Sequence, residues 1–184
     1  MTRPRLSVVL VTLNEEERLR ACLESVAWAD EIVVIDALSQ DKTAQIAREF
    51  TDRVIVRPWP GFAAQKNFGL AEASGDWILS LDADEQVSPE LREEIQRVLD
   101  VDGPHDGYRV PRRNLFGGQW VRHGGLWPDW QLRLFRRGRG RFVERAEIVA
   151  QVQAPARTHP RQHTLPSRHQ RLALSQILAE RMNT

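Results

Sequence analysis

Three carboxylates follow one apolar stretch of the sequence within four positions. Residues 77–81 are Trp-Ile-Leu-Ser-Leu, and Asp82, Asp84 and Glu85 come directly after them. A short apolar run of this kind is typical of a buried strand. Asp82 and Asp84 are two positions apart, so on an extended backbone their side chains point to the same side. Paired carboxylates bind hard cations such as Mg²⁺ or Mn²⁺, which bridge to phosphate groups. The alternative is an acidic turn before a helix that starts near Ser88.

Two other apolar runs also end in polar side chains. Residues 6–13 are rich in β-branched side chains and are followed by Asn14, and residues 31–35 are followed by Asp36. Both patterns predict buried strands. Asn14, with Glu17 three positions later, has the spacing of a helix N-terminus, so a helix is expected from Asn14 to about residue 27.

Strands and helices alternate through the first hundred residues. A third strand is expected at 53–57, and further helices at about 42–50, 62–73 and 88–99. This alternation is typical of βαβ units, which form a mostly parallel, Rossmann-like α/β sheet flanked by helices. Right-handed crossovers bring the carboxyl ends of such strands to one edge, where ligands bind in open α/β folds. That edge is expected to gather Thr12, Asn14, Glu15, Asp36, Asp82 and Asp84.

The length and composition restrict the class of protein. The chain has 184 residues, which fits one domain, and 41% of them are hydrophobic, enough for a core. Its single cysteine, Cys22, excludes an internal disulfide and is expected to be a small buried residue of the first helix. No stretch approaches the ~20 apolar residues of a membrane span, and the N-terminus lacks a signal-peptide pattern. We therefore expect a cytoplasmic protein.

The net charge of +1 conceals two halves of opposite sign. Residues 1–106 hold 11 Lys and Arg against 21 Asp and Glu, a net of −10. Residues 107–145 hold 10 Arg against two acids, a net of +8, and residues 146–184 add +3. We therefore expect one domain at 1–150, with an acidic, metal-binding first half at 1–106 and a second half at 107–150 that is suited to anions.

The second half and the tail have patterns of their own. Residues 107–113 and 131–136 are typical of half-exposed strands, and the loop between them holds three Trp and four Gly. Aromatic faces stack well on sugar rings, so this loop is a candidate binding wall, with an ordinary packed loop as the alternative. The tail at 151–184 is basic and interrupted by proline, so we expect it to be poorly ordered apart from a short helix within Leu172–Met182.

Four segments of the first half together match a known family. They are S-V-V-L-V-T-L-N-E-E at 7–16, V-V-I-D-A-L-S-Q-D-K-T at 33–43, Q-K-N-F-G at 65–69 and G-D-W-I-L-S-L-D-A-D-E at 75–85. Through these segments the chain resembles the family 2 glycosyltransferases of the GT-A fold. That family transfers a sugar from a nucleotide-sugar to an acceptor with inversion at the anomeric carbon.

The second half narrows the resemblance to one branch. The segments G-Y-R-V-P-R-R-N at 107–114, R-H-G-G-L-W-P-D at 122–129 and Q-L-R-L-F-R-R at 131–137 are similar to bacterial lipopolysaccharide-core β-1,4-glucosyltransferases. The resemblance implies an inverting enzyme that moves a hexose, here glucose, from a UDP-sugar to a cell-envelope glycolipid such as the lipopolysaccharide core. The Arg-rich half would face this anionic lipid acceptor or the membrane surface, so peripheral contact with the inner membrane is expected.

The resemblance also implies roles for single residues. The residues expected to bind the nucleotide are Thr12, Asn14, Glu15, Asp36, Lys66 and Asp82. Asp36 would hydrogen-bond the base, and Asp84, beside Asp82, would hold a Mn²⁺ or Mg²⁺ ion on the diphosphate. The simpler alternatives are a helix cap for Asn14, a turn cap for Asp36 and a surface position for Lys66.

Two features depart from the family pattern. Leu38 replaces a glycine of the second-strand loop, so a positive φ there would be strained. Related enzymes have a Val-His-Glu stretch in the second half, whereas here Phe142 is followed by Val-Glu-Arg-Ala-Glu. The candidates for the catalytic base are Glu147, Asp129 and Glu144, in that order. The tail matches nothing in the family, which indicates an atypical or truncated C-terminus.

Three other functions compete with this one. A nucleotidyltransferase would have a Gly-rich, basic loop after the first strand, where this chain has Asn14 and three glutamates. A nucleic-acid-binding module would interleave aromatic residues along a basic face, whereas the Trp residues here are clustered in one loop, so no nucleic-acid partner is expected. A donor-binding homologue with impaired catalysis is favoured by the missing His-Glu pair.

Overall fold

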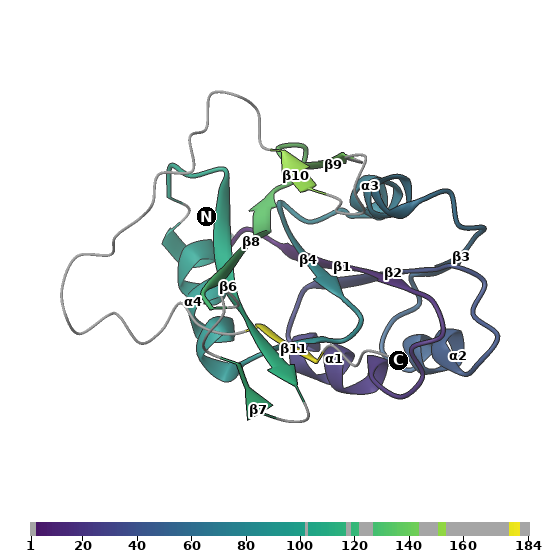
Figure 1. Cartoon of the computed structure of the whole chain (residues 1–184). Helices are drawn as coiled ribbons and strands as arrows, with labels where there is room; N and C mark the ends of the chain where they lie inside the picture. The colour runs from purple at the N-terminus through teal and green to yellow at the C-terminus, as the bar shows by residue number, and fades with distance from the viewer. Residues whose placement is uncertain are drawn as a thin grey trace.

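The computed structural model describes residues 3–101, 103–116, 119–121, 127–143, 151–153 and 177–180. Within this part of the chain, nine strands form a mixed sheet with the order β3-β2-β1-β4-β8-β6-β11-β5, and β7 pairs with β6 (Figure 1). A smaller sheet pairs β9 with β10. The elements are β1 (Leu6–Thr12), α1 (Leu19–Val26), β2 (Glu31–Asp36), α2 (Thr43–Arg48), β3 (Val54–Val56), α3 (Phe62–Glu72), β4 (Trp77–Asp82), β5 (Glu85–Val87), α4 (Pro89–Val101), β6 (Gly107–Phe116), β7 (Gln119–Trp120), β8 (Asp129–Arg136), β9 (Arg141–Val143), β10 (Gln151–Gln153) and β11 (Ile177–Glu180).

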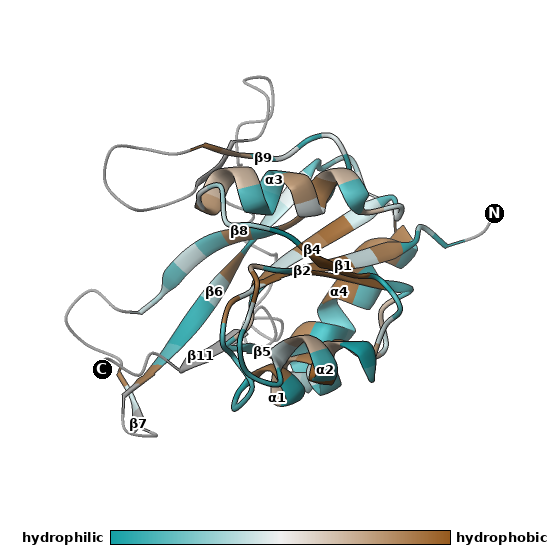
Figure 2. Cartoon of the chain, turned by 90° about the vertical axis from the view of Figure 1, so that its right-hand side faces the viewer, coloured by the Kyte–Doolittle hydropathy of each residue, from teal (hydrophilic) through white to brown (hydrophobic). Residues whose placement is uncertain are grey.

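Four strands of the first half form a parallel block on one side of the sheet, with β3 at its edge. β1 pairs with β2 on one side and with β4 on the other, and β2 pairs with β3. The strands β1, β2 and β4 are almost entirely buried, as a parallel sheet covered on both faces requires. α3 covers one face, and α1, α2 and α4 lie on the other (Figure 1, Figure 2). This architecture confirms the predicted α/β fold class.

Apolar side chains fill both spaces between the sheet and its helices. The larger cluster joins β1 and β4 to α1 and α4 and includes the fully buried Trp77 and Leu79. The smaller cluster lies on the α3 side and includes Val9 and Ile35. Cys22 is fully buried in the larger cluster, as predicted, and burial raises the pKa of its thiol. No helix in the part of the chain that the structure describes is long and apolar enough to span a membrane.

The second half continues the sheet of the first half. β8 pairs antiparallel with β4, and β6 pairs antiparallel with β8. β11 joins the other side of β6 and also pairs with β5. Side chains of the Arg-rich half are therefore placed directly beside the strand that ends in Asp82.

Two predicted helices differ from the structure. α1 begins at Leu19 and not at Asn14. Asn14 adopts a positive φ of 53°, and its Oδ1 accepts a hydrogen bond from the backbone N–H of Gln40, so it caps a neighbouring loop instead. The short helix expected within Leu172–Met182 is wrong at residues 177–180, which form β11 between β6 and β5. Strand edges offer unpaired backbone groups that favour an added strand over a helix.

Leu38 has a positive φ, the conformation that would be strained for a residue other than glycine at this position. Its φ is 60°, and 53% of its surface is exposed. A side chain with a Cβ clashes with its own carbonyl in this region of φ and ψ, at a cost of roughly 1–2 kcal/mol. The exposed side chain recovers little of that cost through packing.

Leu38→Gly is expected to raise the free energy of unfolding by roughly 0.5–1 kcal/mol, because glycine adopts this conformation without the clash. Urea denaturation of the two proteins measures the difference. Leu13→Gly is the matched control, since Leu13 is similarly exposed at 48% and its φ is not positive. The control should lose about 0.5–1 kcal/mol of stability through added chain entropy. Equal losses in both variants would show that Leu38 is not strained.

Candidate functional site

The carboxyl ends of β1, β2 and β4 lie side by side at one edge of the sheet. Thr12 is opposite Asp36 in the parallel ladder, and Val11 is opposite Asp82. The segment after β4 adds Asp84, and the loop after β1 adds Asn14 and Glu15. The structure thus brings the predicted polar residues of three strand ends to one edge of the sheet.

Asp36 is buried at the end of β2 and is occupied by local hydrogen bonds. The Thr12 hydroxyl donates to Asp36 Oδ1 at 3.0 Å, and Ser39 donates through its backbone N–H (2.9 Å) and its hydroxyl (2.5 Å). Only 1% of Asp36 is exposed. The residue therefore caps the turn that holds Leu38, which is the simpler of its two expected roles, and its contact with a base stays a prediction.

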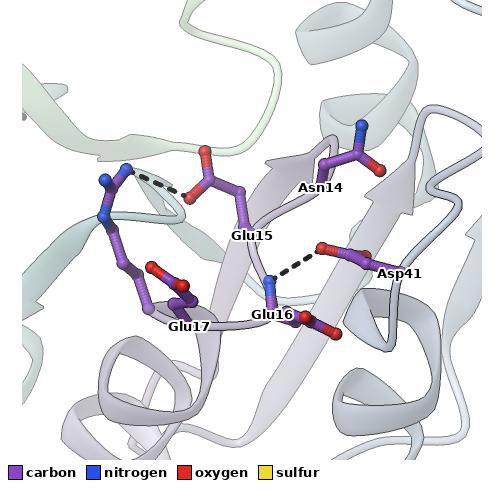
Figure 3. A pocket seen from close by; sticks show the side chains of 6 residues that line it. Asn14, Glu15, Glu16, Glu17 and Asp41 are labelled. Carbon is purple, nitrogen blue, oxygen red and sulfur yellow. Dashed lines mark hydrogen bonds and ion pairs between the residues drawn. The ribbon is translucent and has the colours of Figure 1, made fainter. Parts of the chain in front are cut away.

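Hydrogen bonds join the loops that follow β1 and β2. The backbone N–H of Glu15 donates to the Thr43 hydroxyl at 2.7 Å. The backbone N–H of Glu16 donates to an Asp41 carboxylate oxygen at 3.2 Å, as Figure 3 shows. A pocket of about 190 Å³ lies here, lined by Asn14, Glu15, Glu16, Glu17, Arg18 and Asp41 (Figure 3). Ligand sites usually measure about 300–1,000 Å³, so this pocket can hold only part of a large ligand.

Asp82 is held by cations from two sides. Lys66 Nζ, from α3, lies 2.6 Å from Asp82 Oδ1, and Arg133 Nη2, from β8, lies 2.8 Å from Oδ2. Burial raises the pKa of Asp82, but the two cations outweigh it and hold this pKa well below its usual range. Lys66 also lies over the ring of Phe142, 5.0 Å from its centroid. The Asp82 side chain is still 38% exposed, so lone pairs remain available to a ligand.

Glu85 is a residue of this site to which the sequence assigned no role. It opens β5, is fully buried, and its Oε2 accepts a hydrogen bond from the backbone N–H of Asp82 at 3.1 Å. Its Oε1 accepts from Arg133 and lies 3.6 Å from Arg112 Nη1. Burial raises the pKa of Glu85, although the positive charge of Arg133 opposes this shift. The sequence feature that could have predicted a buried acid such as Glu85 is Arg133, because an arginine within an apolar strand needs a buried anionic partner.

Asp84 has no ion pair with any residue that the structure describes, and it is half-buried. Burial and the neighbouring charge of Asp82 raise the pKa of Asp84. The pKa of Glu15 is also raised, first by burial and then by the nearby negative charge of Asp84. Among the described residues, no three His, Cys, Asp or Glu side chains converge into a complete metal site. The protein therefore offers an incompletely neutralised carboxylate cluster at the strand ends.

Asp129, one of the three candidate bases, is engaged in an ion pair. Arg112 Nη2 lies 2.7 Å from Asp129 Oδ2, and Gln131 donates to Oδ1 at 2.6 Å. Burial raises the pKa of Asp129, but these hydrogen bonds and the Arg112 charge outweigh it and lower the pKa overall. A carboxylate held in this way is a poor proton acceptor. The other candidates, Glu144 and Glu147, lie outside the described residues.

Several arginines of the second half neutralise carboxylates of the protein itself. Arg133 and Arg112 approach Glu85, and Arg136 lies 3.8 Å from Asp106. The opposite charges of the two halves are thus brought together inside one sheet. Fewer arginines are therefore left to face the anionic lipid or membrane surface that is expected from the sequence.

The aromatic loop of the second half is described in part. Trp120 and Trp127 pack edge to face with ring centroids 5.1 Å apart, and Arg113 lies 4.2 Å from the centroid of Trp120. Trp130 is 47% exposed. Residues 122–126 lie outside the described residues, so the sugar-binding wall stays a prediction.

Comparison with known sequences identifies relatives. The family model described as Glycosyl transferase family 2 matches residues 7–153. The lipopolysaccharide core biosynthesis glycosyltransferase LpsC of Rhizobium meliloti (strain 1021) is 37% identical over 142 residues, which cover 74% of this chain and 53% of LpsC. An uncharacterized glycosyltransferase of Rickettsia bellii (strain RML369-C) is 41% identical over 96 residues, which cover 52% of this chain and 33% of that protein. The chain thus spans about half or less of the length of these relatives.

Comparison with solved structures identifies proteins that share the fold of this chain. The crystal structure of S. aureus TarS 1-349 matches with a TM-score of 0.56 and 21% identity, covering 72% of this chain and 47% of that one. The same TarS fragment in complex with UDP-GlcNAc matches with a TM-score of 0.52 and 25% identity, covering 61% and 36%.

Asp84→Asn is expected to raise the free energy of unfolding at pH 7. Because the pKa of Asp84 is raised in the folded protein, the folded state binds more protons than the unfolded state at pH values between the two pKa values. The free energy of unfolding therefore falls as the pH rises through that window. Above the window, the ionised Asp84 destabilises the folded protein by the full amount. Replacing the charge should remove this cost, and the gain should shrink below about pH 4.

Urea denaturation at pH 7 and at pH 3.5 checks this expectation. Asp52→Asn is the matched control, because Asp52 is an exposed acid just before β3, at the opposite edge of the sheet. Equal gains in the two variants, or a gain for Asp84→Asn that persists at pH 3.5, would contradict it.

Proposed function

The chain belongs to glycosyl transferase family 2, and we propose that it transfers a hexose from a nucleotide-sugar to a hydroxyl group of a cell-envelope glycolipid. The observation that carries this proposal is the edge where β1, β2 and β4 end. There Asp84 lacks an ion pair among the described residues, while its neighbour Asp82 is held by Lys66 and Arg133. Such an edge is suited to a cation-bound diphosphate at the place where open α/β sheets bind ligands.

The residues at this edge fit a divalent cation. Asp84 has no ion pair among the described residues, and its charge adds to burial in raising the pKa of Glu15, which Arg18 offsets only in part. Asp84 would hold a Mn²⁺ or Mg²⁺ ion, with Asp82 beside it, and substrate phosphates would complete a site that the protein supplies only in part. The ion would supply charge stabilisation to the departing diphosphate.

A UDP-sugar is the donor that we propose. TarS, at 25% identity, has been crystallised with UDP-GlcNAc. In this chain Thr12 and Ser39 hold Asp36 at the strand end where the base would lie, and Asn14 and Glu15 line the adjoining pocket. Glucose is the hexose implied by the resemblance to lipopolysaccharide-core glucosyltransferases.

The chain's own residues would orient the donor and receive the acceptor proton. Lys66 places a positive charge beside Asp82, from which it can approach the nucleotide. The acceptor oxygen forms a bond to the anomeric carbon on the face opposite the diphosphate, whose bond to that carbon breaks, and the hydroxyl proton passes to a carboxylate. Glu147 is the first candidate for this base and Glu144 the second, because the Asp129 carboxylate is occupied by Arg112 and Gln131.

We propose the lipopolysaccharide core as the acceptor. LpsC, which is 37% identical over 74% of this chain, is described as a lipopolysaccharide core biosynthesis glycosyltransferase. A glycolipid acceptor requires access to a membrane surface, so we propose peripheral contact with the cytoplasmic face of the inner membrane.

A second candidate function is donor binding with little turnover. The ion pair of Asp129 favours it, because one of the three candidate bases is thereby a poor proton acceptor. The two functions share the donor site and differ only in the transfer step.

Asp84→Ala is expected to weaken Mn²⁺-dependent UDP binding by at least roughly 100-fold, since even outer-shell changes at metal sites cost about 10–100-fold. Isothermal titration with UDP, with and without Mn²⁺, measures this effect. Asp52→Ala, an exposed acid outside the site, is the control and should bind as the wild type does. A wild type that binds no nucleotide would remove the proposed function.

Glu147→Gln is expected to lower donor turnover by roughly 100-fold or more, whereas Asp129→Asn should lower it by less than about tenfold. UDP release from UDP-glucose in the presence of purified lipopolysaccharide core measures both rates. The opposite ranking would assign the base to Asp129. Wild-type turnover no faster than the rate without protein, with UDP binding intact, would favour the second candidate function.

A further inference from the structure

The segment between β4 and β5 is a tight, internally closed turn. β4 ends at Asp82, β5 begins at Glu85, and only Ala83 and Asp84 lie between them. Glu85 closes the turn by accepting a hydrogen bond from the backbone N–H of Asp82 at 3.1 Å. The direction of the Asp84 side chain therefore depends on how firmly Asp82 and Glu85 are held.

Arg133 holds both ends of this turn at once. A single nitrogen, Nη2, lies 2.8 Å from Asp82 Oδ2 and also donates to Glu85 Oε1. The Arg133 side chain is 7% exposed and that of Glu85 is 0% exposed, so water does not weaken the contact between them. The arginine comes from β8, in the second half of the chain, and reaches a turn of the first half.

The geometry of Arg133 is a poor arrangement for stability alone. Its Nε is buried and bonds to no described group, although a guanidinium can bind a carboxylate through two parallel hydrogen bonds. Buried ion pairs also add little net stability compared with apolar side chains of similar size. Bridging two carboxylates through one nitrogen instead fixes the relative position of the two residues that frame Asp84.

We propose that Arg133 is a positioning residue of the donor site, which together with Glu85 sets the Asp82–Glu85 turn so that Asp84 is the carboxylate left for the cation. The proposal rests on the proposed function for the identity of the ligand, but the order of the turn itself does not. It implies that donor binding by the first half depends on a side chain of the second half. Arg133 need not touch the donor to have this effect.

The variants separate positioning from folding. Arg133→Met would leave Glu85 buried without its closest cation and is liable to unfold, so the informative variant is the double substitution Arg133→Met with Glu85→Gln, which removes one charge of each sign. Arg133→Lys keeps the charge and should preserve both the order of the turn and the Mn²⁺-dependent binding of UDP. Arg136→Gln is the matched control, because Arg136 lies on the same strand but pairs with Asp106.

The first measurement is amide hydrogen exchange of the ligand-free protein over residues 82–87. The double variant should exchange faster there than the wild type, while residues 6–12 of β1 keep their protection. Arg133→Lys and Arg136→Gln should resemble the wild type in this segment. Unchanged exchange over residues 82–87 in the folded double variant would overturn the proposal, whether or not the protein binds nucleotide.

The second measurement is the ratio of UDP dissociation constants without and with Mn²⁺. The double variant should lower this ratio by about 10–100-fold, the usual effect of an outer-shell change, with less than about threefold change in metal-free binding. An equal loss with and without Mn²⁺ would indicate a merely structural role and overturn the proposal. A wild type that binds no UDP would remove the proposed function, while the exchange measurement would still decide the role of Arg133.

Discussion

The contact of Arg133 with Asp82 and Glu85 is the interaction on which the rest of the site depends. Parallel strands bring carboxylates to one edge of the sheet, and two of those carboxylates are held together at the β4–β5 turn. An unpaired charge in such a place is costly, so a buried cation must accompany it. The cation comes from β8, which lies beside β4 because the second half extends the same sheet. The charge asymmetry between the two halves is therefore a property of the fold as well as of the surface.

The ion pairs of Asp82 leave Asp82 and Asp84 in different electrostatic states. Lys66 and Arg133 neutralise Asp82, whereas Asp84 keeps a raised pKa and has no ion pair among the described residues. A site that binds a cation must hold negative charge that its own protein does not satisfy, and such charge lowers stability until the ligand arrives. The strained φ of Leu38, in the turn capped by Asp36, is a second local cost at the same edge of the sheet.

The sequence was sufficient for the fold class and for most of the residues at this edge, because apolar runs and their polar ends follow directly from parallel pairing. It also identified Leu38 as a position where a positive φ would be strained, and the structure supplies that φ. The start of α1 was wrong because the Asn14 side chain bonds to the next loop, a contact between distant segments. Glu85 was missed for a related reason: β5 has three residues, and the partner Arg133 is 48 positions away.

The division of roles between Asp82 and Asp84 is tested most directly by the position of the cation in a crystal structure of the protein with UDP and Mn²⁺. An Asp84 oxygen is expected within roughly 2.2 Å of the ion, with Asp82 still bound to Lys66 and Arg133. An ion held by Asp82, with Arg133 displaced and Asp84 turned away, would contradict it.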